Sequence, residues 1–194
     1  MIELSIFLGS LLEDLEDLGH PACLVGGLAV SIRTEPRFTQ DIDLALAIAD
    51  DSQVEQLVFS LQQRGYALVA LVEQKAMDRI ATLRLTRAHD RETIADLLVA
   101  SSGIEAEIVE AGEALEVFPG QLVRVAPVSH LLAMKVLSRD DETRPQDIGD
   151  LRALLSVASA RDRITARSLL ESIVARGFHT DRDLLAAWDE LVET

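Results

Sequence analysis

The sequence predicts a mixed α/β fold of the α+β kind, with a mixed, largely antiparallel sheet and a helical C-terminal part. Strand-length apolar runs alternate with helices up to residue 126, whereas helix-length segments fill residues 127–194. Polar connections between the middle strands suit antiparallel neighbours. We therefore expect a sheet-containing domain at 1–126, with a helical domain at 127–194 packed on it and a cleft between the two.

Composition and charge narrow the function classes. The chain has 194 residues, 33 acidic against 18 basic, and a net charge of -15. Such a chain repels polyanions, so general coating of nucleic acid is excluded and DNA is not an expected partner, although a local basic groove stays open. The single cysteine, Cys23, cannot form an internal disulfide, and acids interrupt the apolar N-terminus. We expect a cytoplasmic protein with no signal peptide and no membrane span.

Periodicity and end signals define the expected elements. Leucines at three- and four-residue steps predict an N-terminal helix that ends at His20-Pro21. Ser52 with Glu55 has the spacing of a capping box and predicts a helix that ends before Gly65. Apolar runs predict strands at 22–25, 41–48, 66–72, 80–85, 93–99 and 121–125, with a short helical stretch after 27. The C-terminal helices are expected at 128–137, 145–157, 165–175 and 181–192.

Two aspartates share one face of a predicted strand. Asp41 and Asp43 alternate with apolar residues, so their side chains project together, roughly 7 Å apart along the backbone. Paired carboxylates can hold two divalent cations about 4 Å apart, the arrangement used for in-line phosphoryl displacement. Without a Cys or His cluster, an all-oxygen donor set favours Mg²⁺. The alternative is an acidic strand end in a very acidic protein.

A glycine pair precedes these acids. Gly26 and Gly27 lie between a buried strand and a helix start, where bare N–H groups and the positive helix terminus can bind phosphate oxygens. A glycine pair alone is more often only a turn. The order strand, Gly-Gly, short helix, then D-x-D on the next strand sets a phosphate cradle beside a metal site, and this order favours function.

The motifs together resemble the DNA polymerase beta-like nucleotidyltransferase superfamily, and more closely the AbiEii/AbiGii-type toxin nucleotidyltransferases. The resemblance spans Leu24 to about Leu155 and implies a sheet of the nucleotidyltransferase type. The stretches that carry it are V-G-G at 25–27, R-x-T-x-D-I-D-L at 37–44, T-I-A-D-L-L at 93–98, the lysine helix around Lys135, and R-P-x-D-x-x-D-L at 144–151.

The resemblance implies a metal and phosphate site. Asp41 and Asp43 would bridge two Mg²⁺ ions and Asp96 would be the third metal ligand, whereas Asp96 could instead be a strand-end acid that meets an arginine. Lys135, with the glycine pair, would hold the phosphates. The alternative for Lys135 is a side chain that extends from a core-facing helix to water.

Five further positions are implied around the nucleotide. Asp147 or Asp150 would position the nucleotide or activate the acceptor, with Asp147 favoured, although acids also suit the first turns of a helix. Arg37 and Thr39 would orient the loop before the metal strand. Arg139 would reach phosphates or else pair with the acids that follow it.

The implied function is a Mg²⁺-dependent enzyme that moves a nucleoside monophosphate from a triphosphate such as ATP to an acceptor hydroxyl. Toxin relatives imply an RNA end such as that of tRNA as the acceptor, and a cognate antitoxin as a partner. The acceptor is alternatively a partner protein or a small hydroxylated molecule such as an antibiotic. A protein of a different class, which binds a nucleotide or a partner without turnover, has no physical need for three acids around one pocket.

Overall fold

The computed structural model describes residues 2–35, 39, 41–74, 77–87, 90–140, 146–179 and 182–193. The elements in chain order are α1 (Ile2–Asp17), β1 (Ala22–Val25), α2 (Gly26–Arg33), β2 (Asp41–Leu46), α3 (Asp51–Gln63), β3 (Tyr66–Gln74), β4 (Arg79–Arg87), β5 (Asp90–Leu98), α4 (Glu105–Ala111), β6 (Glu113–Phe118), β7 (Gln121–Val125), α5 (Val128–Ser138), α6 (Gln146–Val157), α7 (Ala160–Ala175) and α8 (Leu184–Glu193).

The strands form one mixed sheet in the order β3-β4-β5-β2-β1-β7-β6. The β1–β7 and β2–β5 pairs are parallel, and the other four neighbouring pairs are antiparallel. This confirms the prediction of a mixed, largely antiparallel sheet. The topology places β2, the strand with the two aspartates, in the middle of the sheet between β5 and β1.

The alternation of residues along the central strands separates a core face from a polar face. Ile42 and Leu44 of β2, Leu83 of β4 and Leu97 of β5 are fully buried. Because successive side chains on a strand point to opposite faces, the residues between these positions lie on the other face. The same two-residue alternation therefore sets both the apolar core face and the opposite, polar face of the sheet.

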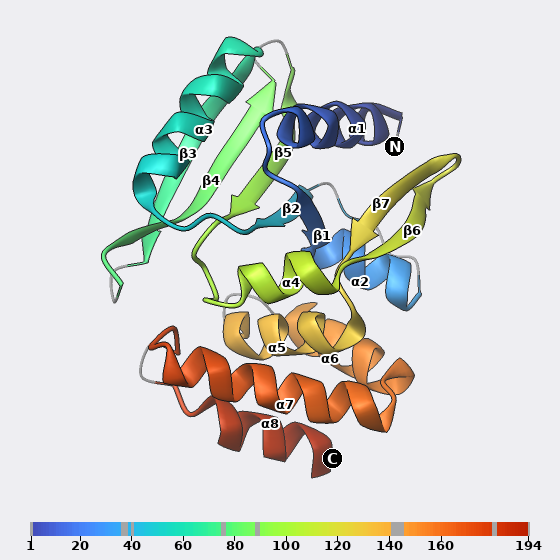
Figure 1. The fold of residues 1–194 in the computed structure, drawn as a ribbon. Helices are drawn as coiled ribbons and strands as arrows, with labels where there is room; N and C mark the ends of the chain where they lie inside the picture. The colour runs from blue at the N-terminus through green and yellow to red at the C-terminus, as the bar shows by residue number, and fades with distance from the viewer. Residues whose placement is uncertain are drawn as a thin grey trace.

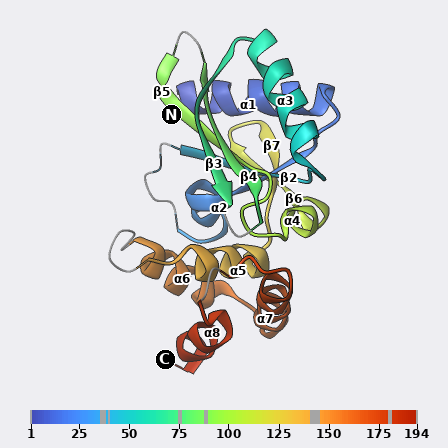
Figure 2. The ribbon, with the colours of Figure 1, turned by 90° about the vertical axis from the view of Figure 1, so that its left-hand side faces the viewer.

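The helices after β7 gather at one end of the molecule, below the sheet and next to α2 (Figures 1 and 2). Helix α5 contacts α6, α7 and α8 within this group, and both α5 and α6 contact α2. The change from strands to helices falls at Ala126, between β7 and α5. The division into domains at 1–126 and 127–194 remains a prediction. None of the described helices is long and apolar enough to cross a membrane.

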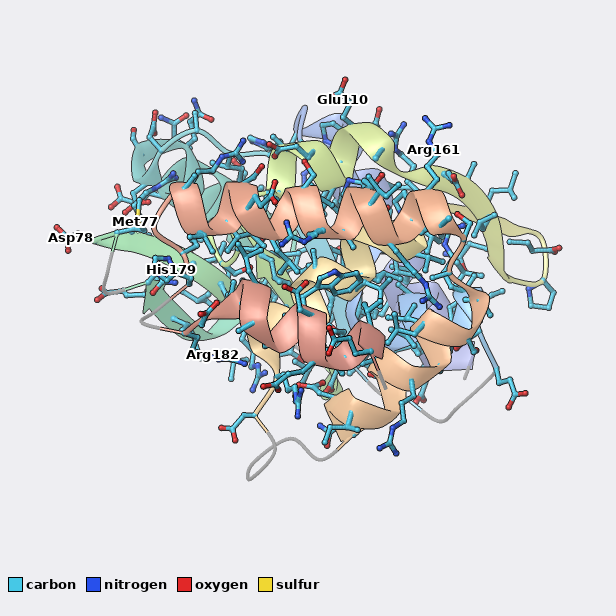
Figure 3. The ribbon with its side chains drawn as sticks, turned by 90° about the horizontal axis from the view of Figure 1, so that it is seen from below. Met77, Asp78, Glu110, Arg161, His179 and Arg182 are labelled. Atoms are coloured by element: carbon cyan, nitrogen blue, oxygen red, sulfur yellow. The ribbon has the colours of Figure 1, made fainter. Side chains whose placement is uncertain are left out.

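The connection between β3 and β4 reaches the turn between α7 and α8. Seen from below, Met77 of the connection lies near His179, while α7 and α8 run side by side (Figure 3). A β-carbon added at Gly177 would lie 3.7 Å from Sδ of Met77, which confirms the contact. The sheet and the C-terminal helices therefore touch beyond α5 as well.

The predicted capping box of α3 is wrong. The helix begins at Asp51, and the N-cap is Asp50, whose Oδ1 accepts a hydrogen bond from the backbone N of Gln53 at 3.0 Å. Asp50 occupies the cap because its extended backbone directs the short carboxylate at the third helical N–H. A true capping box is formed instead by Ser159 and Asp162, which starts α7 at Ala160 rather than at 165.

Two elements are absent from the sequence prediction. Helix α4 has only seven residues and begins with the buried Glu105, whose Oε1 accepts from the backbone N of Ser101 and Ser102 in the preceding loop. Strand β6 is an edge strand in which no residue is fully buried, and its neighbour in the sheet is β7. Helix α4 depends on local polar contacts and β6 on one neighbouring strand. Neither segment therefore shows a strong periodic pattern of apolar residues in the sequence.

Candidate active site

Two adjoining cavities lie between the polar face of the sheet and α5. The larger has a volume of about 450 Å³ and is lined by β2 to β5, α5 and Phe178. The smaller has a volume of about 150 Å³ and is lined by Gly26, Gly27 and Lys135 among others. Asp43 and Met134 line both cavities. The larger volume is in the range of small-ligand sites, about 300 to 1,000 Å³.

The three predicted metal-binding aspartates share one face of the sheet. In the parallel β2–β5 pair, Asp43 is in register with Asp96, and Asp41 with Ile94. Side chains in register on neighbouring strands point to the same face, and Asp41 is two residues from Asp43. The sheet therefore brings Asp96 beside Asp43 from a distant part of the sequence.

The charge on Asp43 is held at an energetic cost. The pKa of its carboxyl is raised from 3.8 to about 6, first by burial and then by the nearby charges of Asp96 and Asp41. Lys135 and a hydrogen bond from the backbone N–H of Gly27 act in the opposite direction. A half-buried carboxylate next to two others is chemically suited to a cation.

Gly26 makes room for this carboxylate. Its φ of +63° is in the left-handed region, and an added β-carbon would lie 1.9 Å from Oδ2 of Asp43. The glycine pair thus lets Asp43 reach the start of α2, where Gly27 donates its N–H. Part of the predicted phosphate cradle is therefore bonded to Asp43.

Asp96 is bound to an arginine that the sequence analysis did not assign. Nε of Arg84 donates to Oδ1 of Asp96 at 2.8 Å, and Nη2 donates to Oδ2 at 2.7 Å. The alternative of an acid that meets an arginine therefore describes Asp96 in this conformation. Within the described ranges, no three His, Cys, Asp or Glu side chains are grouped closely enough to hold a metal ion. The three carboxylates on one face of the sheet are the oxygen ligands that a hard divalent cation prefers. One of them, Asp96, is hydrogen-bonded to Arg84.

Lys135 joins two buried aspartates of α6. Its Nζ lies 2.7 Å from Oδ1 of Asp147 and 2.8 Å from Oδ2 of Asp150, and the two carboxyl side chains are only 2% and 4% exposed. Lys135 therefore does not extend to water as the alternative proposed. Asp147 and Asp150, three residues apart, share a helix face that is turned toward α5. Oδ2 of Asp147 is buried and has no hydrogen-bond partner among the described residues.

Of the remaining predicted site residues, Arg139 and Thr39 do not line these two cavities. Arg139 follows α5 and lines a separate cavity of about 630 Å³ with Arg152 and Arg163. Thr39 is half-buried ahead of β2. Arg37 lies outside the described residues.

Arg84 is the charged site residue that sequence reasoning missed, although a signal for it exists. On β4 it alternates with the buried Leu83 and Leu85, so the pattern predicts that it points to the polar face. The missing information is the β4–β5 register, which aligns Arg84 with Asp96. Register is set by packing between strands and cannot be read from either strand alone.

A mixed sheet with paired aspartates on a central strand, beside a glycine-started helix and a lysine helix, defines a nucleotidyltransferase-like protein. Solved structures share the fold. An antigenic nucleotidyltransferase-like protein from Paracoccidioides brasiliensis matches with a TM-score of 0.55 and 20% identity, covering 96% of this chain and 92% of that chain. ANT(2″)-Ia in complex with adenylyl-2″-tobramycin matches with a TM-score of 0.59 and 16% identity, covering 91% and 99%.

The family can be stated as well. The model of the family described as "Nucleotidyl transferase AbiEii toxin, Type IV TA system" matches residues 10–192, and the chain belongs to this family. It is thus a nucleotidyltransferase, as the sequence motifs predicted. No curated protein sequence matches the chain.

Proposed function

We propose that this nucleotidyltransferase depends on Mg²⁺, and that Asp41, Asp43 and Asp96 hold two of these ions. The observation that carries the proposal is the register of Asp43 with Asp96, next to Gly27 and a cavity that Lys135 also lines. When bound, the cations would neutralise the triphosphate and activate the acceptor hydroxyl. The acid cluster of Asp43 and its neighbours supplies the negative charge that such ions need.

The phosphate-binding groups in this proposal are on α5 and at the start of α2. An ammonium group has three N–H donors, and Asp147 and Asp150 lie within ion-pair distance of Nζ of Lys135. The third donor and the side-chain charge are available to a phosphate oxygen in the smaller cavity. The two aspartates hold the ammonium in place, so we assign them a positioning role. Oδ2 of Asp147 has no hydrogen-bond partner in the part of the chain that the structure describes, which favours Asp147 for an additional contact with the nucleotide.

The transfer itself requires positioning more than covalent chemistry from the protein. The acceptor oxygen attacks the α-phosphorus, the bond from that phosphorus to the bridging oxygen breaks, and pyrophosphate leaves. The larger cavity, next to Asp96, is the place for the acceptor. Its walls on β3, β4 and α5 would exclude water from the reacting groups.

We favour an RNA end, such as that of tRNA, as the acceptor. The chain is acidic overall, yet Arg139, Arg152 and Arg163 line one cavity beside α5 and α6. Arg152 is exposed and makes no hydrogen bond or ion pair with the described residues. A local basic groove of this kind offers phosphate contacts that the overall charge does not. The family description supports a toxin role with an antitoxin partner, and the reducing cytoplasm remains the expected location.

The test is nucleotidyl transfer with defined components. The purified protein is incubated with each labelled triphosphate and Mg²⁺, in parallel with total RNA, with protein alone, or with aminoglycoside and lincosamide antibiotics. We expect label on RNA, no label without Mg²⁺, and none with Asp43→Asn. Label on protein or on an antibiotic would instead identify that molecule as the acceptor. Triphosphate binding without pyrophosphate release under every condition would overturn it in favour of a binding protein.

A surface variant tests the RNA proposal separately. Arg152→Gln removes one charge from the basic groove and touches none of the residues proposed to bind metal or triphosphate. We expect weaker RNA labelling with a reduced salt dependence and unchanged triphosphate affinity. Arg167→Gln, on the exposed face of α7, is the control for the loss of one positive charge.

A further inference from the structure

Three charged residues form a row across three neighbouring strands. Asp43 of β2 is in register with Asp96 of β5, and Asp96 is in register with Arg84 of β4. Side chains in register project to the same face, so the row runs along the floor of the larger cavity, which all three residues line. Asp96 therefore lies between the carboxylate of Asp43 on one side and the guanidinium of Arg84 on the other.

The Arg84–Asp96 pair is a complete side-on ion pair. Both oxygens of Asp96 accept from Arg84, and the side chains of Arg84 and Asp96 are 46% and 15% exposed. The pKa of Arg84 is raised, first by its hydrogen bond and charge interaction with Asp96, and to a lesser degree by Asp41 and Asp43. The guanidinium thus lies in the field of all three acids. In the described part of the chain, no other cation forms an ion pair with any of the three.

From this geometry we infer that Arg84 is an internal counter-ion that competes with the divalent cation for Asp96. This inference rests on the proposed metal-dependent function. A cation and the guanidinium draw on the same carboxylate, and Coulomb repulsion between them opposes simultaneous tight binding. Arg84 orients the carboxylate of Asp96 on the polar face and releases it when a cation binds. It acts through Asp96, so it is a positioning residue.

The inference predicts a change in metal affinity that a purely structural arginine would not produce. Mn²⁺ binding is measured without nucleotide, by electron paramagnetic resonance titration, for wild type and for Arg84→Gln. Removal of the competing charge is expected to tighten the Mn²⁺ dissociation constant by about tenfold or more. Arg167→Gln, which removes an equal charge from an exposed pair with Glu171, is expected to leave it within about twofold.

A second background tests whether Arg84 acts through Asp96. In Asp96→Asn protein, the further change Arg84→Gln is expected to give a clearly smaller gain in affinity than it gives in wild type. An Arg84→Gln affinity equal to wild type, or an equal gain in both backgrounds, would overturn the inference. Folding of each variant is checked by its melting temperature before titration.

The outcome also separates this inference from the proposed function. If wild type binds no Mn²⁺, or if Asp43→Asn binds it as well as wild type, the metal site itself is misassigned. If Asp43→Asn abolishes binding while Arg84→Gln does not change it, the metal site stands and only the role of Arg84 is wrong.

Discussion

Gly26 and Asp43 occupy adjoining space so closely that only a hydrogen on Cα of residue 26 fits. A β-carbon there would lie 1.9 Å from Oδ2 and 2.4 Å from Cγ of Asp43. The carboxylate reaches the N–H of Gly27 because of this space. The glycine is therefore a requirement for the position of the acid and not only for the turn.

Gly26→Ala should abolish nucleotidyl transfer and lower stability by more than backbone strain explains. An L-residue in the left-handed region costs about 1–2 kcal/mol, and here the carboxylate must also move. Gly120→Ala is the matched control, because Gly120 has a φ of +76° and a β-carbon there would have no neighbour within 4 Å. Urea unfolding and transfer assays on both variants measure the difference. Equal stability loss and full activity in both would contradict this account.

Asp43→Asn should stabilise the protein at pH 8 but not at pH 4. The folded-state pKa of about 6 lies above the ordinary value of 3.8, so the folded state binds the proton more tightly. Stability from this group is therefore lost as pH rises from about 3.8 to 6, and the full cost, about 3 kcal/mol, remains above that range. Asn removes the charge and keeps an oxygen for the Gly27 N–H.

Melting temperatures across pH 4 to 8, in buffer with a chelator, measure this gain. Asp41→Asn is the control, because it neutralises an exposed carboxylate on the same strand face and should give a smaller gain. A fall of many degrees in the melting temperature of Asp43→Asn at pH 8 would instead identify Asp43 as a partner in a stabilising ion pair.

Lys135→Met should cost about 3–5 kcal/mol of unfolding free energy, because it leaves Asp147 and Asp150 buried without their cation. The triple variant that also carries Asp147→Asn and Asp150→Asn should recover most of this loss. Arg167→Met, which breaks an exposed pair with Glu171, should cost under about 1 kcal/mol. Chemical denaturation measures the unfolding free energy of each variant. If the triple variant recovers no stability, the loss in Lys135→Met does not come from leaving Asp147 and Asp150 without their cation.

Cys23 should not react with Ellman's reagent in the folded protein. Burial raises the pKa of its thiol to about 12, so almost no thiolate exists at pH 8, and the side chain is fully buried. In 8 M urea, one thiol per chain should react at once. Rapid labelling of the native protein would mean that the strand β1 opens far more readily than its central place in the sheet implies.

The parts of the site that follow local periodicity could be predicted from the sequence. Alternation along one strand predicts that Asp41 and Asp43 share a face, and a spacing of three predicts the same for Asp147 and Asp150. The glycine pair follows β1 directly, as expected, and forms the first two residues of α2. These relationships involve residues close in sequence, where backbone geometry alone sets direction.

The parts that depend on contacts between distant elements could not be predicted. The Arg84–Asp96 pair requires the register of β4 with β5, which includes an irregularity between Leu85 and Arg87. The partners of Lys135 require α6 to pack on α5 with one particular face. Tertiary packing decides both, and the motif residues reveal only which side chains are available.

Parallel pairing of β2 with β5 separates Asp43 from Asp96 in the order of synthesis. Parallel neighbours cannot be joined by a tight hairpin, and here α3, β3 and β4 lie between β2 and β5 along the chain. A nascent chain that has emerged only through β4 carries Asp43 without Asp96, and Lys135 arrives later still with α5. During translation, a protein of this topology is therefore without its complete aspartate row until β5 has been made, and without its lysine until α5 has been made.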